Sequence, residues 1–156
     1  VLGIFGREGL DLATLWAPPD PTDPGAFAFR MYLNYDGAGS PFGETRVRAT
    51  STDQGQLSIY AAQRASDQAV TVMVINKTTG SLSTTLNLTG FSAAAAARVF
   101  RYSSADLAHI VRQSDLTVTT SGVAFSVPAN SITLIELLPG TPLVLTPRVR
   151  MPMMAR

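Results

Sequence analysis

The sequence contains no cysteine and a single histidine, His109. Without cysteine there are no disulfide bonds, thiolate nucleophiles or cysteine-ligated zinc, and one histidine cannot build a histidine-rich metal site. We therefore expect no metal centre and no cofactor. Charged residues make up only 15% of the chain, and 12 Lys and Arg against 11 Asp and Glu leave a net charge of +1. This balance excludes nucleic acid or an anionic membrane as a partner held by bulk charge.

Long apolar runs are missing as well. No stretch reaches the roughly 18 residues that a membrane-spanning helix needs, so we expect no membrane partner. Residues 1–8 also lack the pattern of a secretion signal, because their charges follow the apolar residues instead of preceding them. Apolar residues nevertheless make up 46% of the chain, which excludes intrinsic disorder. The 156 residues allow one domain, or a small domain plus a fragment.

The first part of the chain divides at a proline-rich stretch. Residues 1–17 carry short apolar runs whose length favours one or two buried strands over a helix. The prolines of residues 18–24 then exclude regular structure until Asp23 and Pro24, which form a typical helix start. Aromatic and apolar residues recur at a spacing of three to four up to Tyr35, and Asp36-Gly37 can end a helix. This pattern predicts one amphipathic helix.

From about residue 44 the apolar period changes to two, which is typical of half-buried strands. Seven stretches fit a strand: residues 56–61, 70–75, 82–88, 99–102, 116–119, 123–127 and 132–138. Short strands separated by turn residues predict an antiparallel β-sandwich rather than alternating α/β units. We expect one helical turn at residues 104–107. The aperiodic, proline- and methionine-rich end, residues 139–156, is predicted to be a disordered tail.

Few residues suggest chemistry of their own. Glu8 lies in an apolar stretch where burial would raise the pKa of its carboxyl, but no second carboxylate is placed opposite it at the roughly 5–9.5 Å of a glycosidase pair. Asp11 lies on the same segment and is expected to accept loop N–H bonds, while Glu44 and Glu136 are expected to be solvated. We therefore assign no catalytic residue.

Other candidates have plain structural explanations. The sequence has no G-x-S-x-G nucleophile elbow, and we interpret His109, three residues after Asp106, as a partly exposed structural residue. Asn76 and Asn87 open glycosylation acceptor sequences, but a turn or a strand explains both. Trp16 is the only tryptophan. It can either stack on a sugar ring at the edge of a cleft or cap the core, and both interpretations stay open.

Several stretches resemble glycoside hydrolase family 44. The run LGIFGREGLDLATLW, residues 2–16, resembles the last barrel strand of that family, and residues 23–37 resemble its final barrel helix. Further stretches that match in order are residues 49–54, 57–62, 72–77 and 128–134. The resemblance covers roughly residues 2–138.

The resemblance implies the C-terminal part of a secreted bacterial endo-β-glucanase that hydrolyses cellulose-like or xyloglucan-like chains with retention. The expected fold is mainly β, an antiparallel β-sandwich (residues 44–138) preceded by the last strand and helix of a (β/α)₈ barrel (residues 1–37). The two catalytic glutamates of the family lie on earlier barrel strands, outside this chain. The implied partners are a β-glucan polysaccharide and the missing barrel portion.

By its position in the resemblance, Trp16 lies at the rim of the barrel, where it would stack on sugar, and Glu8 is the second candidate for substrate binding. Two alternatives stay open for the sandwich. It could bind glycans without cleaving them, or it could prop an adjacent catalytic domain, with residues 1–37 as the docking surface. A small enzyme with its own site at Glu8 and Asp11 is a further alternative.

Overall fold

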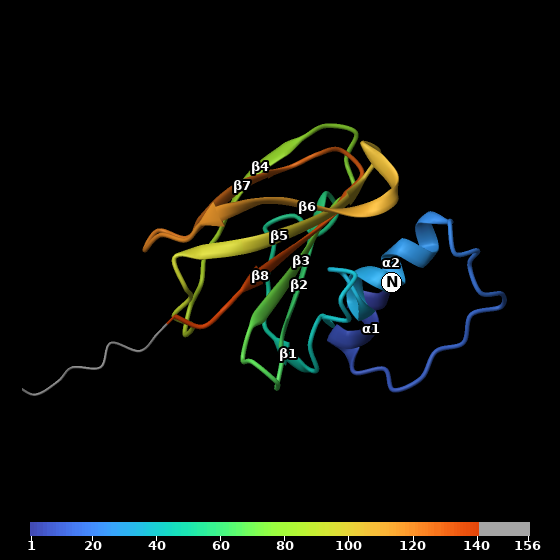
Figure 1. Cartoon of the computed structure of the whole chain (residues 1–156), viewed down its shortest axis with the longest axis horizontal. Helices are drawn as coiled ribbons and strands as arrows, with labels where there is room; N and C mark the ends of the chain where they lie inside the picture. The colour runs from blue at the N-terminus through green and yellow to red at the C-terminus, as the bar shows by residue number, and fades with distance from the viewer. Residues whose placement is uncertain (141–156) are drawn as a thin grey trace, which may run out of the picture.

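The computed structural model describes residues 1–140, and the chain folds mainly into β-strands (Figure 1). The elements in chain order are α1 (Leu2–Glu8), α2 (Pro24–Leu33), β1 (Thr45–Val47), β2 (Leu57–Gln63), β3 (Val70–Asn76), β4 (Leu82–Leu86), β5 (Ala96–Ser103), β6 (Asp106–Thr117), β7 (Val123–Val127) and β8 (Ser131–Leu137). In the described residues, no helix is long and apolar enough to cross a membrane.

The strands form two antiparallel sheets. The large sheet has the order β1-β2-β3-β8-β5-β6, and β4 pairs with β7 in a small second sheet. The last strand of the chain, β8, therefore lies in the middle of the large sheet, between β3 and β5. Figure 1 shows β4 and β7 on one side of this sheet and the two helices on the other. The predicted β-sandwich is confirmed.

The two faces of the large sheet carry separate apolar clusters, because successive residues of a strand point to opposite sides. Met73 and Leu134 face the helices, whereas their neighbours Val74 and Ile135 face the small sheet. The cluster on the helical side is rich in aromatic residues and contains Phe27, Met31, Tyr35, Phe42, Phe100 and Tyr102. The large sheet is thus covered on both faces, which explains why β3 and β8 are nearly continuously buried.

Helix α2 confirms the helix expected after the prolines. Pro24 occupies its first turn after Asp23, which has an extended backbone. Phe27, Met31 and Tyr35 follow one another at four-residue intervals and are all buried against the sheet. The ring of Phe27 stacks on Tyr102 of β5 with 4.7 Å between the ring centroids. Three large side chains therefore hold this helix on the sandwich.

The strands expected within residues 1–17 are wrong, because residues 2–8 form α1 and residues 10–22 form neither helix nor strand. Gly9 ends α1 in the left-handed conformation with φ 69°, and its N–H donates to Phe5 O. A strand needs a neighbouring strand to satisfy its backbone, and no strand in the described part of the chain pairs with residues 10–22.

Two predictions near the C-terminal end also need correction. Residues 104–107 are not a helical turn, because Ser104 and Ala105 form the tight turn between β5 and β6 and the next two residues open β6. Pro139 pairs with Ala93, and the N–H of Gly140 donates to Ser92 O at 2.8 Å. These two residues of the predicted tail are therefore ordered; residues 141–156 lie outside the described part of the chain.

Candidate functional site

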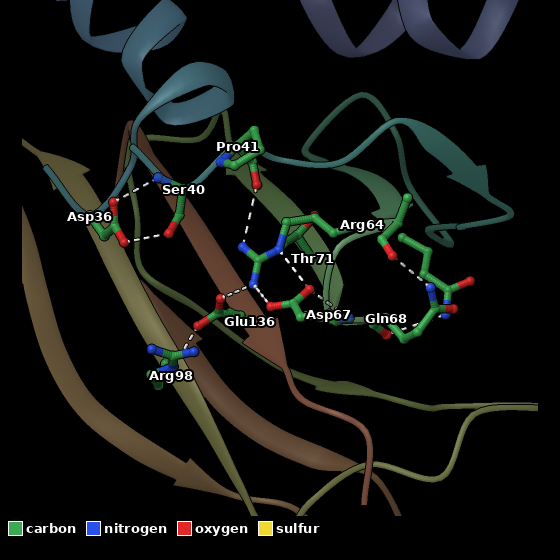
Figure 2. A network of polar contacts seen from close by, with 12 residues as sticks. Asp36, Ser40, Pro41, Arg64, Asp67, Gln68, Thr71, Arg98 and Glu136 are labelled. Carbon is green, nitrogen blue, oxygen red and sulfur yellow. Dashed lines mark hydrogen bonds and ion pairs between the residues drawn. The ribbon is translucent and has the colours of Figure 1, made fainter. Parts of the chain in front are cut away.

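A network of polar contacts lies between α2 and the large sheet, around the carboxylate of Glu136 (Figure 2). Glu136, on β8, is only 2% exposed. Its Oε1 accepts hydrogen bonds from the hydroxyl of Tyr35 at 2.7 Å and from Arg64 Nη2 at 2.5 Å. Its Oε2 forms an ion pair at 2.5 Å with Arg98 Nε, although the approach is too oblique for a hydrogen bond. The expectation of a solvated Glu136 is wrong.

Arg64, which follows β2, connects this carboxylate to two loops. Its Nε and Nη2 donate to the two carboxylate oxygens of Asp67, at 3.0 and 2.6 Å. Its Nη1 donates to the hydroxyl of Tyr35 and, at 3.4 Å, to the carbonyl of Pro41. A guanidinium has five donors in a planar fork, and this one spreads them over four residues. We call Tyr35, Arg64, Asp67, Arg98 and Glu136 the Glu136 cluster.

Burial and charge shift the pKa values within the Glu136 cluster. Burial, together with the hydrogen bond to Glu136, raises the pKa of the Tyr35 hydroxyl, so this group stays protonated and donates. The hydrogen bonds from Arg64 lower the pKa of Asp67 below its usual range, and Asp67 in turn is the largest cause of the raised pKa of Arg64. The groups of the cluster therefore hold one another in these protonation states: Tyr35 neutral, Arg64 positive and Asp67 negative.

The chemistry open to the Glu136 cluster is limited, because its polar groups form hydrogen bonds and ion pairs with one another. Neither Glu136 nor Asp67 lines either of the two cavities described below. A general acid or base must reach a substrate atom within hydrogen-bond distance, and a carboxylate that is 2% exposed and held by two arginines does not. The cluster therefore fastens the turn after α2 to the centre of the sheet.

The two residues expected to bind substrate are both at the surface. The side chain of Glu8 is 63% exposed at the end of α1, and its Oε1 accepts a hydrogen bond from Arg7 Nε at 2.7 Å. The burial considered for its carboxyl is not found. Trp16 is 104% exposed and lies in the segment between the helices that has no regular structure. Its ring is free on all sides, so the alternative in which Trp16 caps the core of this chain is wrong.

The remaining sequence candidates have local partners. His109 is 74% exposed and lies 3.0 Å from a carboxylate oxygen of Asp106, as a surface residue of β6. Glu44 is exposed, as expected, and accepts the N–H of Ala65 at 3.0 Å. Asn76 is 1% exposed, and its side-chain amide donates to Gly80, Val127 and Pro128 carbonyls. Asn76 is therefore a structural residue between the two sheets, whereas Asn87 is exposed.

Two of the cavities on the described part of the chain lie beside the large sheet. The first, about 380 Å³, lies between α1 and strands β1 and β2, and its lining includes Arg7, Arg46, Arg48 and Tyr60. Arg46 donates to Arg7 O at 2.7 Å and so caps the C-terminal end of α1. The second, about 920 Å³, is a groove between β4 and the chain segment of residues 47–53. Among residues 1–140, no three His, Cys, Asp or Glu side chains gather in a way that could hold a metal ion.

Sequence reasoning missed the Glu136 cluster because its members lie far apart in the chain. Arg64 and Glu136 are 72 positions apart, and Tyr35 and Glu136 are 101 positions apart. The one available signal was the charged residue between Ile135 and Leu137 in a strand with no polar alternation. Such a residue on a doubly covered strand needs a buried partner.

Comparisons with known proteins find relatives among glucan-degrading enzymes. No protein-family model matches the chain. It is 38% identical over 78 residues to the β-mannanase/endoglucanase A of Caldicellulosiruptor saccharolyticus, which covers 49% of this chain and 6% of that protein. It is also 38% identical over 77 residues to endoglucanase A of Paenibacillus lautus, covering 49% of this chain and 11% of that protein.

Solved structures match over most of the chain. CelM2, a bifunctional glucanase-xylanase from a metagenome library, superposes with a TM-score of 0.85 and 43% identity, covering 89% of this chain and 27% of that one. A glycoside hydrolase family 44 endoglucanase from Clostridium acetobutylium gives 0.80 and 28%, and a family 44 xyloglucanase from Paenibacillus polymyxa gives 0.79 and 26%. Each match to these two covers 88% of this chain and 27% of the other, so the chain spans about a quarter of their length.

Proposed function

Because this chain is related by sequence and fold to the endoglucanases and xyloglucanases of glycoside hydrolase family 44, we propose that it is the C-terminal portion of a secreted endo-β-1,4-glucanase. The complete enzyme hydrolyses cellulose-like or xyloglucan-like chains with retention of configuration. This portion supplies the β-sandwich and one rim of the substrate cleft, and the two catalytic glutamates come from outside these residues. The proposal rests on the superposition of 88–89% of the chain on enzymes of this kind that are more than three times as long.

The exposed apolar side chains in the segment between the two helices indicate that another part of the complete enzyme covers this segment. Leu10, Leu12, Leu15 and Trp16 are all between 50% and 104% exposed. An apolar stretch of this size in water is typical of an interaction surface. We propose that, in the complete enzyme, the remainder of a (β/α)₈ barrel covers this stretch and that residues 1–37 contribute the last strand and helix of that barrel.

Trp16 and Glu8 are the residues that we propose to contact substrate. A tryptophan side chain offers a broad apolar face with few rotatable bonds, which suits stacking on a sugar ring. Full exposure leaves the ring of Trp16 free for this contact. Glu8 lies beside Arg7, and its side chain is exposed. Its carboxylate can accept hydrogen bonds from sugar hydroxyls. Neither residue is proposed to take part in bond cleavage.

Hydrolysis assays on the purified chain test the proposal directly. We expect no reducing-sugar release from carboxymethyl-cellulose or xyloglucan above buffer, for the wild-type chain and for the Glu8→Gln and Trp16→Ala variants alike. Clear hydrolysis that Glu8→Gln abolishes would contradict the proposal, because the chain would then hold a complete active site of its own. Detection of the complete enzyme in the culture medium of the producing organism tests secretion.

The full exposure of Trp16 favours a second candidate, a module that binds glycans without cleaving them. The two candidate functions differ in the affinity for xyloglucan that they predict for the isolated chain. A glycan-binding module is retarded during native electrophoresis through a gel that contains xyloglucan, and Trp16→Ala removes the retardation. One rim of a cleft contacts only a few sugar units, so the proposed glucanase portion migrates unretarded. Leu107→Ala, which removes an exposed apolar side chain on β6, is the matched control.

A further inference from the structure

The cavity of about 380 Å³ lies between two parts of the chain that hold each other in place. Helix α1 forms one wall, and β1, the residues that follow it and β2 form the other. Arg46 on β1 donates to Arg7 O near the end of α1 at 2.7 Å, and the backbone of Gly3 lies against the ring of Tyr60 on β2. Contacts within this chain therefore fix both walls of the cavity.

Positive charge predominates in the lining of this cavity. The lining includes three arginines, Arg7, Arg46 and Arg48, against one carboxylate, that of Glu44. Arg48 is exposed and has no ion-pair partner among the described residues. A guanidinium has five N–H donors and no acceptor, so three of them beside one cavity favour a ligand that carries negative charge.

A tyrosine hydroxyl gives a second, independent indication of a ligand. Tyr32 of α2 lines the cavity, and its hydroxyl is buried without a hydrogen-bond partner among the described residues. Burial raises the pKa of this hydroxyl, so the group stays protonated and needs an acceptor for its hydrogen. Buried polar groups in folded proteins are nearly always satisfied by protein, water or ligand. A negatively charged oxygen inside the cavity would satisfy Tyr32 and pair with the arginines.

The size and the apolar part of the lining favour an organic anion over an inorganic one. The volume of about 380 Å³ lies at the lower end of the roughly 300–1,000 Å³ of pockets for small organic ligands. Leu2, Phe42 and Ile59 are among the lining residues. An apolar ligand body would remove these side chains from water, which a hydrated inorganic ion would not do. A carboxylate matches the planar fork of a guanidinium with its two oxygens.

We propose that this cavity is a binding site for a small organic carboxylate. The carboxylate group pairs with Arg46 and Arg48 and accepts the hydrogen bond that the hydroxyl of Tyr32 donates. The apolar body of the ligand packs against the lining between α1 and β2. The ligand therefore joins α1, α2 and the edge of the large sheet.

The cavity is separate from the exposed apolar segment that the rest of the enzyme is proposed to cover. None of residues 8–31 lines the cavity, so covering Leu10 to Trp16 does not by itself close it. The chemistry also differs, because that segment is apolar whereas three arginines line the cavity. Carboxylate binding does not rest on the proposed glucanase role, and the hydrolysis assays and the titrations below give independent results.

Titration of the purified chain with benzoate and with benzamide, followed by amide NMR, tests the proposal. The two probes have nearly the same shape, but only benzoate is charged. We expect benzoate to bind with a Kd of roughly 1 mM, to shift the resonances of residues 2–7, 42–50 and 59–62, and to bind more weakly at high salt. Benzamide should bind about tenfold more weakly or not at all. Equal affinity for the two probes, no binding of benzoate, or shifts confined to other residues overturns the proposal.

Variants identify the groups that hold the carboxylate. Arg48→Met removes a guanidinium that has no ion-pair partner in the described part of the chain, so the fold should persist while the affinity for benzoate falls about tenfold. Tyr32→Phe removes only the hydroxyl and should weaken binding several-fold. Lys77→Met removes a positive charge that does not line the cavity and is the matched control, with the affinity of the wild type. Equal affinities of Arg48→Met and Lys77→Met contradict the proposal.

The same titration on a longer enzyme that contains this chain tests whether the site stays open there. A benzoate affinity like that of the isolated chain, again lowered by Arg48→Met, supports the proposal. Loss of benzoate binding in the longer enzyme means that another part of that enzyme fills the cavity, and this overturns the proposal. Neither result changes the interpretation of the hydrolysis assays.

Discussion

The two helices are attached to the sandwich in different ways. Helix α2 inserts Phe27, Met31 and, just beyond its end, Tyr35 into the aromatic cluster, and the hydroxyl of Tyr35 reaches the buried carboxylate of Glu136. Helix α1 buries only Gly3. Its attachment includes the contact between that glycine and the ring of Tyr60 and the hydrogen bond from Arg46 to its C-terminal end. Helix α2 is therefore part of the core, whereas α1 lies on its surface.

The largest effect is expected from removing the guanidinium at the centre of the Glu136 cluster. Arg64→Ala leaves Glu136 and Asp67 with fewer partners, and uncompensated buried charge typically costs about 3–5 kcal/mol. The free energy of unfolding in urea measures the loss. Arg7→Ala breaks an ion pair whose side chains are about half exposed and should change stability by less than about 1 kcal/mol. Equal losses for the two variants would contradict the role given to the cluster.

The next largest effect tests the packing of α2. Met31 is fully buried beneath this helix, and Met31→Ala should lower the free energy of unfolding by about 2–5 kcal/mol. Leu33, two residues on, is mostly exposed, so Leu33→Ala should stay within about 0.5 kcal/mol. Thermal and urea unfolding of both variants measure the difference. A loss for Leu33→Ala as large as that for Met31→Ala would mean that the helix packs through its other side.

A pair of glycines tests the attachment of α1. A Cβ atom on Gly3 would lie 2.4 Å from the ring of Tyr60, whereas a Cβ on Gly6 would have nothing within 4 Å. Both changes to alanine favour the helix itself by about 1 kcal/mol. We expect Gly3→Ala to lower the hydrogen-exchange protection of residues 2–8 and Gly6→Ala to raise it. Global stability should change little in either case. Protection that rises in both variants would show that α1 does not depend on this contact.

The smallest effect is expected on the loss of folding stability at low pH. The hydrogen bonds from Arg64 lower the pKa of Asp67 in the folded chain, so this carboxylate stabilises the fold above its unfolded pKa of about 3.9. The contribution disappears as the pH falls through the lower, folded pKa. Because the side chain of Asp67 is partly exposed, we expect less than about 1 kcal/mol.

Urea midpoints measured from neutral pH to about pH 2 test this prediction. Asp67→Asn should lose less stability than the wild type over the acid end of this range. In an Arg64→Ala background the same change should alter the slope less, because Arg64 is gone and the N–H of Ala69 still donates to the carboxylate. An Asp67→Asn profile parallel to that of the wild type would contradict the prediction.

The parts of the fold that the sequence predicted are those with a strong local pattern. The alternation in β2, the continuous apolar run of β3 and the four-residue spacing in α2 each reflect what one element buries. Most of β6 was missed, because an exposed edge strand such as this one carries polar residues on both faces. Residues 2–8 were assigned to a strand because a short apolar run fits either element, and only the stop at Gly9 distinguished them.

The polar core could not be predicted for a different reason. Glu136 and Asn76 are hydrophilic residue types whose burial depends on partners far away in the chain. Local pattern carries no information on such partners, and the default expectation for an isolated carboxylate is exposure. The ring of Trp16 and the carboxylate of Glu8 are both exposed. Their role in binding substrate stays a prediction.

The central position of β8 has a consequence for how the protein is made. Strands β3 and β5 each pair with β8, which the ribosome synthesises after both. Until residues 131–137 have left the exit tunnel, the two halves of the large sheet have no strand between them and keep open apolar edges. The large sheet of the nascent chain is therefore completed only after β8 has emerged, and its unpaired strand edges make it prone to aggregation until then.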